Sequence, residues 1–447
     1  MRFLHLAASA LALALAAGQP VAAAPTPDDA TRKAIEADYD SSLGALFLDF
    51  HQHPELGFKE NRTAAKMAEL LKAAGLEVTT GVGGTGVVGI LRNGKGPTIL
   101  LRADMDGLPV EEKSGLAYAS KARQVGEDGQ EYPVMHACGH DTHITAMIAT
   151  ARRLVALKGQ WSGTLMFIVQ PAEEGVRGAK AMMDDGLYQR FGKPDYALAF
   201  HVAAEMTTGT IAASQSIQYS SSDNLEITVP GVGTHDAAPH LGKDPVYIGS
   251  QIVTALQAID SREISPLKPV VVTVGSFHAG TRGNIISDQA VLQLTVRAND
   301  VATRDQVIAA IERIATGIGK ANGLPDTLPV KVRLNSSTPV TDNDPVLARR
   351  LNASLAKTLG PGVVVPFEQR NMGAEDFAYF VAPGLGVPGY YFAVGGTTPE
   401  RLAAAKAGGP QIAGHHSPLF QVAPRESITL GARAMVAAVL DLAGKGK

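Results

Sequence analysis

The spacing of apolar residues along the chain alternates between a helical period and short continuous runs. Residues 63–74 repeat apolar positions at helical spacing before Gly75, which predicts a helix and its end. A second helical pattern covers residues 144–157. Short apolar runs predict four buried strands, at residues 87–92, 98–103, 164–170 and 196–202. Strands that alternate with helices predict an α/β fold with a mixed, largely parallel sheet and helices on its faces.

The pattern of apolar and polar residues changes near residue 214, where a polar, Ser-rich stretch runs to residue 223. The pattern after it predicts strand, helix, strand, strand, helix and strand at residues 224–229, 245–259, 270–277, 290–298, 303–321 and 330–334. This order is typical of a small α+β (ferredoxin-like) domain inserted into a larger one. We therefore place the larger domain at residues 25–213 and 337–447 and the inserted domain at residues 214–336.

Residues 1–24 have the pattern of a secretory signal peptide. Met1 and Arg2 precede an almost wholly apolar run at residues 3–18, and small residues follow at positions 22–24. A membrane anchor is the alternative, but the run is shorter than the ~20 residues of a spanning helix and ends in Gly and Pro. We expect an exported protein, either periplasmic or fully secreted, that is not bound to a membrane after the signal is removed.

Composition narrows the classes of function. Lys and Arg total 40 against 43 Asp and Glu, a formal charge of −3, so the chain has no overall basic field with which to hold nucleic acid. A hydrophobic share of 45% in 447 residues is ample for a buried core in each domain. The single cysteine, Cys138, excludes an intramolecular disulfide and metal centres held by several thiolates.

Side chains able to bind a metal follow several of the predicted strands. Ligands of an open α/β sheet bind beyond the carboxyl ends of its strands. Three strands lead into acidic residues or histidine, a segment rich in His and Cys precedes the helix at 144–157, and two histidines lie near the C-terminus. The residues are Asp104, Asp106, Cys138, His140, Glu173, Glu174, His201, His415 and His416. Thiolate, imidazole and carboxylate together suit zinc, and the oxygen donors also admit manganese or cobalt.

Each of these residues has an ordinary structural explanation on its own. A single histidine is more often a hydrogen-bonded structural residue, adjacent glutamates are usually solvated, and one cysteine usually packs as a small apolar side chain. As a set they need another explanation, because charged groups at the ends of buried strands are costly to desolvate unless an opposite charge lies among them. A divalent cation would supply that charge.

Five sequence motifs occur in order between His53 and His416. They are RADMDGLP at residues 102–109, MHACGHDTH at 135–143, QPAEE at 170–174, GxGxHxAxPH at 231–240 and GAEDF at 373–377. In these motifs the chain resembles the amidohydrolase branch of the aminoacylase and carboxypeptidase-like metallopeptidases, which includes hippurate hydrolases and auxin-conjugate amidohydrolases. The resemblance implies that the larger domain is catalytic and that the inserted domain is a lid and dimerisation domain.

The resemblance implies a set of metal ligands that coincides with most of the strand-end residues: Cys138, His140, Glu174, His201 and His416. It also implies two divalent ions per subunit, of zinc, manganese or cobalt, bridged by the Cys138 thiolate. A competing interpretation makes Cys138 a nucleophile with His140 as its base, which would leave the other candidate ligands unexplained.

The resemblance further implies which residues carry the reaction. Glu173 is the general base, which takes a proton from the metal-bound water and delivers it to the departing amine, and Asp106 supports the ligands. His235 and Asn284, in the inserted domain, are implied to hold the oxyanion, often from the lid of a partner subunit, which predicts a homodimer. Arg282 is a candidate for binding a substrate carboxylate.

Three features depart from the family pattern. Asp236 follows His235 where alanine is usual, Gly107 replaces a more common alanine, and residues 122–132 are longer than the usual turn before the cysteine motif. None of them changes the candidate ligands. They bear on the substrate pocket, over which the longer segment is expected to form a loop.

Together these observations predict a metal-dependent amidohydrolase that hydrolyses the amide bond of N-acyl amino acids or similar small conjugates. A dipeptidase or carboxypeptidase acting on small peptides is the nearer alternative, since the same centre cleaves any amide of suitable shape. An alternative of another class is a non-catalytic metal- or solute-binding protein. Glu173 argues against it, because such a protein needs no unligated carboxylate beside the metal.

Overall fold

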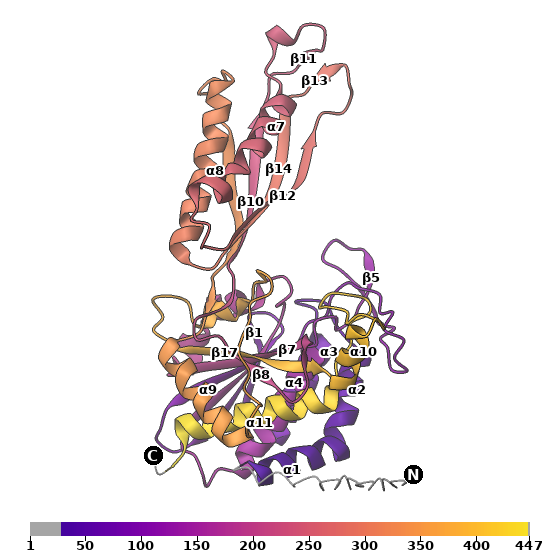
Figure 1. The fold of residues 1–447 in the computed structure, drawn as a ribbon, viewed down its shortest axis with the longest axis vertical. Coiled ribbons are helices and arrows are strands. Elements are labelled where there is room, and N and C mark those ends of the chain that lie inside the picture. The colour runs from indigo at the N-terminus through magenta and orange to yellow at the C-terminus, as the bar shows by residue number, and fades with distance from the viewer. Residues whose placement is uncertain (1–27, 446–447) are drawn as a thin grey trace, which may run out of the picture.

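The computed structural model describes residues 28–445, so the predicted signal peptide lies outside the described part of the chain. The base of the molecule is a seven-stranded sheet with the order β1-β2-β6-β3-β7-β17-β8 (Figure 1). Its strands are β1 (Glu77–Val82), β2 (Gly86–Asn93), β3 (Thr98–Asp104), β6 (Gly163–Gln170), β7 (Tyr196–Thr207), β8 (Ile211–Ala212) and β17 (Gly389–Thr397). Neighbours among β6, β3, β7 and β17 are parallel, and the remaining pairs are antiparallel. The predicted mixed, largely parallel α/β sheet is confirmed.

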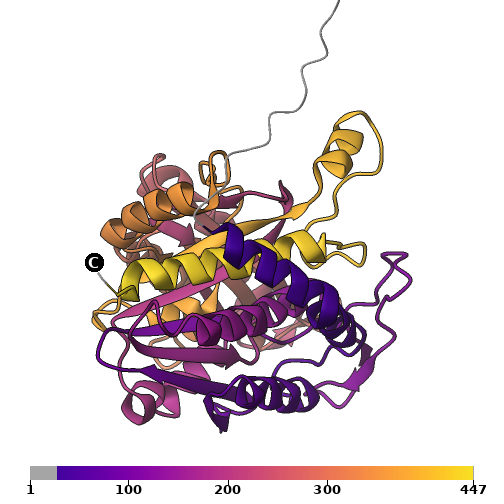
Figure 2. The same cartoon turned by 90° about the horizontal axis from the view of Figure 1, so that it is seen from below.

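Helices cover both faces of this sheet. Successive strand residues point to opposite faces, so Leu101 lies in one core and Leu100 in the other. The Leu101 face packs against α1 (Asp29–Asp38), α2 (Gly44–Gln52), α3 (Asn61–Ala73), α4 (His140–Ala156), α9 (Pro345–Leu359) and α11 (Pro424–Ala443). The Leu100 face packs against α5 (Gly178–Asp184), α6 (Leu187–Phe191) and the 3-10 turn η4 (Asp376–Phe380). Seen from below, α11 runs across the base beside α1 (Figure 2).

A second, four-stranded antiparallel sheet with the order β12-β14-β10-β15 forms an elongated lid that projects from the base (Figure 1). Its main elements are β10 (Ser222–Pro230), α7 (Pro245–Leu256), β12 (Val270–Ala279), β14 (Gln289–Ala298), α8 (Val301–Ala321) and β15 (Lys331–Thr338). The two helices pack on one face, over Leu225, Ile227 and Val229 of β10. Two short strands, β11 (Thr234–His235) and β13 (Ile285–Ile286), pair at the far end of the lid.

Three segments differ from the expected elements. β7 extends to Thr207, so His201 lies inside the strand and not after its end. α7 ends at Leu256 and is followed by a separate π-helical turn, η3 (Ile259–Glu263), in place of one helix to residue 259. The segment at residues 122–132 contains a hairpin of β4 (Arg123–Val125) and β5 (Glu131–Pro133).

The remaining short elements are η1 (Tyr39–Leu43), β9 (Ile217–Tyr219), η2 (Pro239–Leu241), β16 (Thr341–Asp342) and α10 (Pro399–Lys406). β9 pairs with β16 where the chain enters and leaves the lid. Among the described helices, none has both the length and the apolar composition needed to cross a bilayer.

Candidate metal centre

The turn before α4 brings two candidate ligands to the sheet. Cys138 and His140 flank Gly139, which has a positive φ of 87°. A β-carbon at this glycine would lie 2.5 Å from Cγ1 of Val202 on β7, so the turn can approach the strand this closely only with glycine. Because Val202 follows His201, the close approach places Cys138 beside His201.

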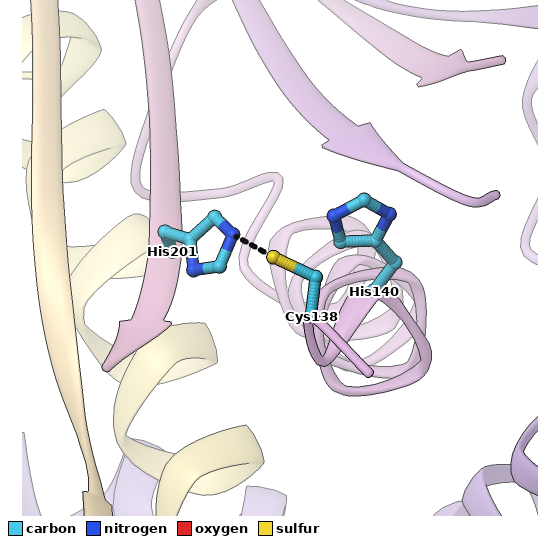
Figure 3. Close-up of side chains that lie close together, drawn as sticks. All are labelled: Cys138, His140 and His201. Atoms are coloured by element: carbon cyan, nitrogen blue, oxygen red, sulfur yellow. Dashed lines mark hydrogen bonds between the residues drawn. The ribbon is translucent and has the colours of Figure 1, made fainter. Parts of the chain in front are cut away.

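The thiol of Cys138 faces the imidazole of His201, with Sγ 3.4 Å from Nε2 (Figure 3). The other ring nitrogen, Nδ1, donates to the backbone carbonyl of Val202 at 2.7 Å, so Nε2 carries a lone pair. Burial holds the pKa of His201 well below its usual value. The ring is therefore neutral, as metal ligation requires.

His140 also has one bonded and one free ring nitrogen. Nδ1 donates to the backbone carbonyl of Asp106 at 2.8 Å, whereas Nε2 is buried and has no hydrogen-bond partner. Nε2 lies 3.8 Å from Glu173 Oε2 and 3.9 Å from Glu174 Oε1. A buried nitrogen without a partner is costly, and a bound cation among these carboxylates would remove that cost.

Glu174 and His416 complete the cluster. His416 Nε2 lies 3.1 Å from Glu174 Oε2, while Glu174 Oε1 is buried without a partner. His416 has a φ of 66°, which is unfavourable for a residue with a β-carbon, and its N–H donates to the carbonyl of Ala137 at 2.8 Å. The C-terminal segment is thus tied to the Cys138 turn in a strained conformation.

The donors converge closely enough to hold divalent cations. Donor atoms within 4.8 Å of one another are supplied by Cys138, His140 and His201, by Cys138, Glu174 and His416, and by His140, Glu173 and Glu174. The unpartnered Nε2 of His140 and Oε1 of Glu174 fit a metal centre, since cations would satisfy both. Cys138, His140 and Glu174 each belong to two of these sets.

Asp106 holds the loop that carries both glutamates. Its carboxylate oxygens accept the backbone N–H groups of Glu173 at 3.0 Å and Glu174 at 3.1 Å. Ala172, the residue before them, has a positive φ of 46°. Burial, together with the carboxylates of Glu375 and Glu174, raises the pKa of Glu173 well above its usual value. The loop therefore presents a carboxylate of high proton affinity beside the ligand cluster.

Comparison with known proteins identifies the family. The sequence model of Peptidase family M20/M25/M40 matches residues 100–441, more than half of the chain. The chain belongs to this family. As a member of the M20 family it is a metal-dependent amidohydrolase or peptidase, and the resemblance to the amidohydrolase branch is confirmed.

Named relatives include both an amidohydrolase and a carboxypeptidase. This M20 chain is 40% identical over 345 residues to the hippurate hydrolase of Campylobacter jejuni, covering 77% of this chain and 86% of the relative. It is 37% identical over 349 residues to thermostable carboxypeptidase 2 of Saccharolobus solfataricus, covering 77% and 83%. The solved structure of the YXEP protein of Bacillus subtilis, described as a dinuclear metal-binding peptidase of the M20 family, matches with a TM-score of 0.73 at 28% identity, covering 91% of this chain and 98% of that one.

In this M20 chain the lid residues implied in catalysis lie far from the ligand cluster. His235 is in β11 at the tip of the lid, and Asn284 immediately precedes β13, which pairs with β11 (Figure 1). His235, Arg282 and Asn284 are all exposed, and His235 Nδ1 lies 2.8 Å from a carboxylate oxygen of Asp236. The structure thus brings together the five candidate ligands with Glu173 and Asp106, but not the three lid residues. The catalytic and ligand roles of all these residues stay predictions.

His143 and Asp104 lie next to the M20 ligand cluster but already have partners. His143 donates from Nδ1 to Asp104 at 2.5 Å and accepts the N–H of Val202 at Nε2, at 2.9 Å. Asp104 also accepts from Arg102 at 2.6 Å. Because their polar atoms already have hydrogen-bond partners within the polypeptide, neither residue is a candidate ligand.

The sequence did not predict the buried arginine behind the centre. Arg102 is fully buried in β3 and pairs with Asp104 at 2.6 Å and Glu375 at 2.7 Å. Glu375 also lies with Glu173 and Asp376 in a group of carboxylates whose oxygens are within 4.8 Å of one another. The sequence does contain a signal for these contacts. Arg102 is a charged residue inside the apolar run at 98–103, and a buried arginine requires carboxylate partners.

Proposed function

We propose that the protein hydrolyses the amide bond of N-acyl amino acids or similar small conjugates and releases a carboxylic acid and an amino acid. The observation that carries the proposal is the convergence of thiol, imidazole and carboxylate donors beside Glu173, a buried carboxylate outside the assigned ligand set. Similarity to a hippurate hydrolase supports the substrate class, because hippurate is itself an N-acyl amino acid.

We assign two divalent ions per subunit to the ligands Cys138, His140, Glu174, His201 and His416. Zinc, manganese and cobalt all suit this mixture of sulfur, nitrogen and oxygen donors. When bound, such ions act as Lewis acids that polarise the scissile carbonyl and acidify a water molecule. The two-ion assignment is supported by the place of Cys138 in two donor sets and by the similarity to the dinuclear YXEP protein.

Glu173 is the general base in this proposal. Its Oε2 lies 3.8 Å from the free nitrogen of His140, so the carboxylate is beside the assigned ligands without being one of them. It takes a proton from the attacking water and returns it to the amide nitrogen as the C–N bond breaks. Asp106 fixes this carboxylate through the backbone N–H groups of residues 173 and 174.

His235 and Asn284 act only when a lid covers a metal centre. We propose a homodimer in which the lid of one subunit supplies these donors to the substrate carbonyl oxygen in the partner's site. The lid offers surface for such contacts, since β12 is an edge strand and Leu241 and Tyr247 expose large apolar side chains. Arg282, also on the lid, is proposed to bind the carboxylate of the substrate.

A dipeptidase or carboxypeptidase that acts on small peptides is the second candidate. Similarity to thermostable carboxypeptidase 2 favours it, and a peptide bond presents the same amide to the same centre. A non-catalytic binding protein is not favoured, because the chain belongs to a family of metal-dependent hydrolases.

A substrate panel separates the two candidates. Benzoylglycine, other N-acyl amino acids and dipeptides are assayed before chelation, after dialysis against a strong chelator, and after zinc, manganese or cobalt is added back. We expect the highest kcat/KM on N-acyl amino acids, loss of activity on chelation and recovery with metal. A preference for dipeptides would support the peptidase, and activity that survives chelation would contradict the metal assignment.

We also propose export, on the pattern of residues 1–24 alone. N-terminal sequencing of the protein from periplasmic and extracellular fractions should give a mature chain that begins near Pro25. An uncleaved chain confined to the cytoplasm would contradict this proposal.

A further inference from the structure

The C-terminal segment brings two adjacent histidines to the metal centre, and only His416 belongs to the assigned ligands. The other, His415, has its Nδ1 3.7 Å from Cys138 Sγ. Its ring packs against the rings of His201 and Phe420, at centroid distances of 5.1 and 5.0 Å. The imidazole of His415 is therefore held against the sulfur by two neighbouring rings.

The surroundings of His415 fix which of its nitrogens carries the hydrogen. Nε2 accepts the backbone N–H of Ala204 at 3.4 Å, so it bears a lone pair. Nδ1 then carries the hydrogen and lies 3.7 Å from the sulfur of Cys138, which is its acceptor. The Nδ1–H of His415 thus points at the residue that we assign as the bridge between two ions.

We propose that His415 donates an N–H···S hydrogen bond to the Cys138 thiolate of the metal-loaded enzyme. The inference rests on the proposed function, because it requires Cys138 to be a metal ligand. A hydrogen bond to a ligating sulfur withdraws charge from it, so the sulfur gives less charge to the ions and these remain stronger Lewis acids. His415 is a positioning residue, since it acts through Cys138 and touches neither substrate nor metal.

The hydrogen bonds distinguish this role from that of a sixth ligand. His140 Nε2 and Glu174 Oε1 have no partner in the polypeptide, whereas both ring nitrogens of His415 have one. Ligation through Nδ1 would require its hydrogen to move to Nε2. That hydrogen would then face the N–H of Ala204, so two buried hydrogen-bond donors would be left without an acceptor.

The test uses the cobalt-loaded enzyme, because thiolate-to-cobalt charge transfer gives a near-ultraviolet band that reports the charge on the sulfur. His415→Phe removes the donor but keeps a ring between His201 and Phe420. His415→Asn returns an N–H close to the position of Nδ1 and is the matched rescue. We expect the band to move to longer wavelength in the Phe variant and back towards the wild-type position in the Asn variant, with two cobalt ions retained in both.

The outcomes separate this inference from the proposed function. A band in the same place in wild type and His415→Phe would overturn the hydrogen bond, and loss of a cobalt ion in that variant would make His415 a ligand instead. Wild-type enzyme that binds cobalt with no thiolate band would overturn Cys138 ligation and this inference together. If the Phe variant fails to fold, as judged by circular dichroism, His415→Leu provides the same readout.

Discussion

Among single residues, Glu173 is the one whose chemistry can be separated from metal binding. Glu173→Gln keeps the size of the side chain but removes its ability to accept a proton, so we expect kcat to fall by about 10²- to 10⁴-fold. Metal content, measured by elemental analysis, should not change, because Glu173 is outside the assigned ligands. Glu400→Gln, on the exposed surface of α10, is the control and should retain full activity. Near-normal turnover in Glu173→Gln would refute the base assignment.

His51 links stability to pH. Burial by itself would lower its pKa, but hydrogen bonds to Asp141 at 2.7 Å and Glu112 at 3.3 Å outweigh burial and raise the pKa to about 9. Because the folded pKa exceeds the unfolded value of 6.5, the stabilisation is fully present below pH 6.5 and is lost as the pH rises through about 9. The difference between these two pKa values corresponds to about 3 kcal/mol of folding free energy.

The measurement for His51 is the free energy of unfolding in denaturant between pH 6 and pH 10. We expect the free energy of unfolding of the wild type to fall across this range. His51→Gln should be less stable than wild type at pH 6, and its stability should fall less between pH 6 and pH 10. His53→Gln, at a half-exposed histidine two residues away, is the matched control for replacing a histidine in this segment. Parallel curves for wild type and His51→Gln would contradict the role of this network.

At the scale of elements, the turn into α4 positions two of the candidate ligands, Cys138 and His140. Gly139→Ala places a β-carbon in a left-handed conformation and 2.5 Å from Val202 Cγ1, so the turn must move away from β7. We expect a loss of about 1 to 3 kcal/mol of stability and weaker metal binding in a chelator competition. Gly159→Ala meets no atom within 4 Å and should match wild type in both measurements. Unchanged metal affinity in Gly139→Ala would show that the turn does not position the ligands.

The same elements show how much of the site a single sequence can predict. The apolar periods located β3, β6 and α4. Because residues that follow neighbouring parallel strands meet at one edge of the sheet, the approach of the acidic residues after β3 and β6 to the Cys138 turn was predictable. The position of His201 inside β7 was not, because the length of a strand depends on its pairing with β17 far along the chain. The pairing of Arg102 with Glu375 and the orientation of His415 likewise depend on contacts between segments more than two hundred residues apart.

At the scale of the whole molecule, the ligand cluster and the lid residues lie at separate places. The candidate metal ligands lie in the base, in β7, in α4 and in loops beside the sheet, whereas His235 lies in β11 at the tip of the lid (Figure 1). Oxyanion stabilisation by His235 therefore requires either a large closure of its own lid or a second subunit. The α+β pattern of the inserted domain could be predicted from the sequence, but the position of its tip relative to the base could not, because periodicity does not report how two domains are oriented.

A complementation experiment distinguishes the two arrangements. Glu173→Gln and His235→Ala chains carry different affinity tags, are produced together, and the mixed dimer is purified through both tags. If His235 acts across subunits, one of the two sites in the mixed dimer combines an intact Glu173 with the partner's His235, so activity should return to about half that of wild type. Each parental dimer should be nearly inactive. A mixed dimer as inactive as its parents would mean that each lid serves its own subunit, and a monomer in sedimentation would refute the dimer altogether.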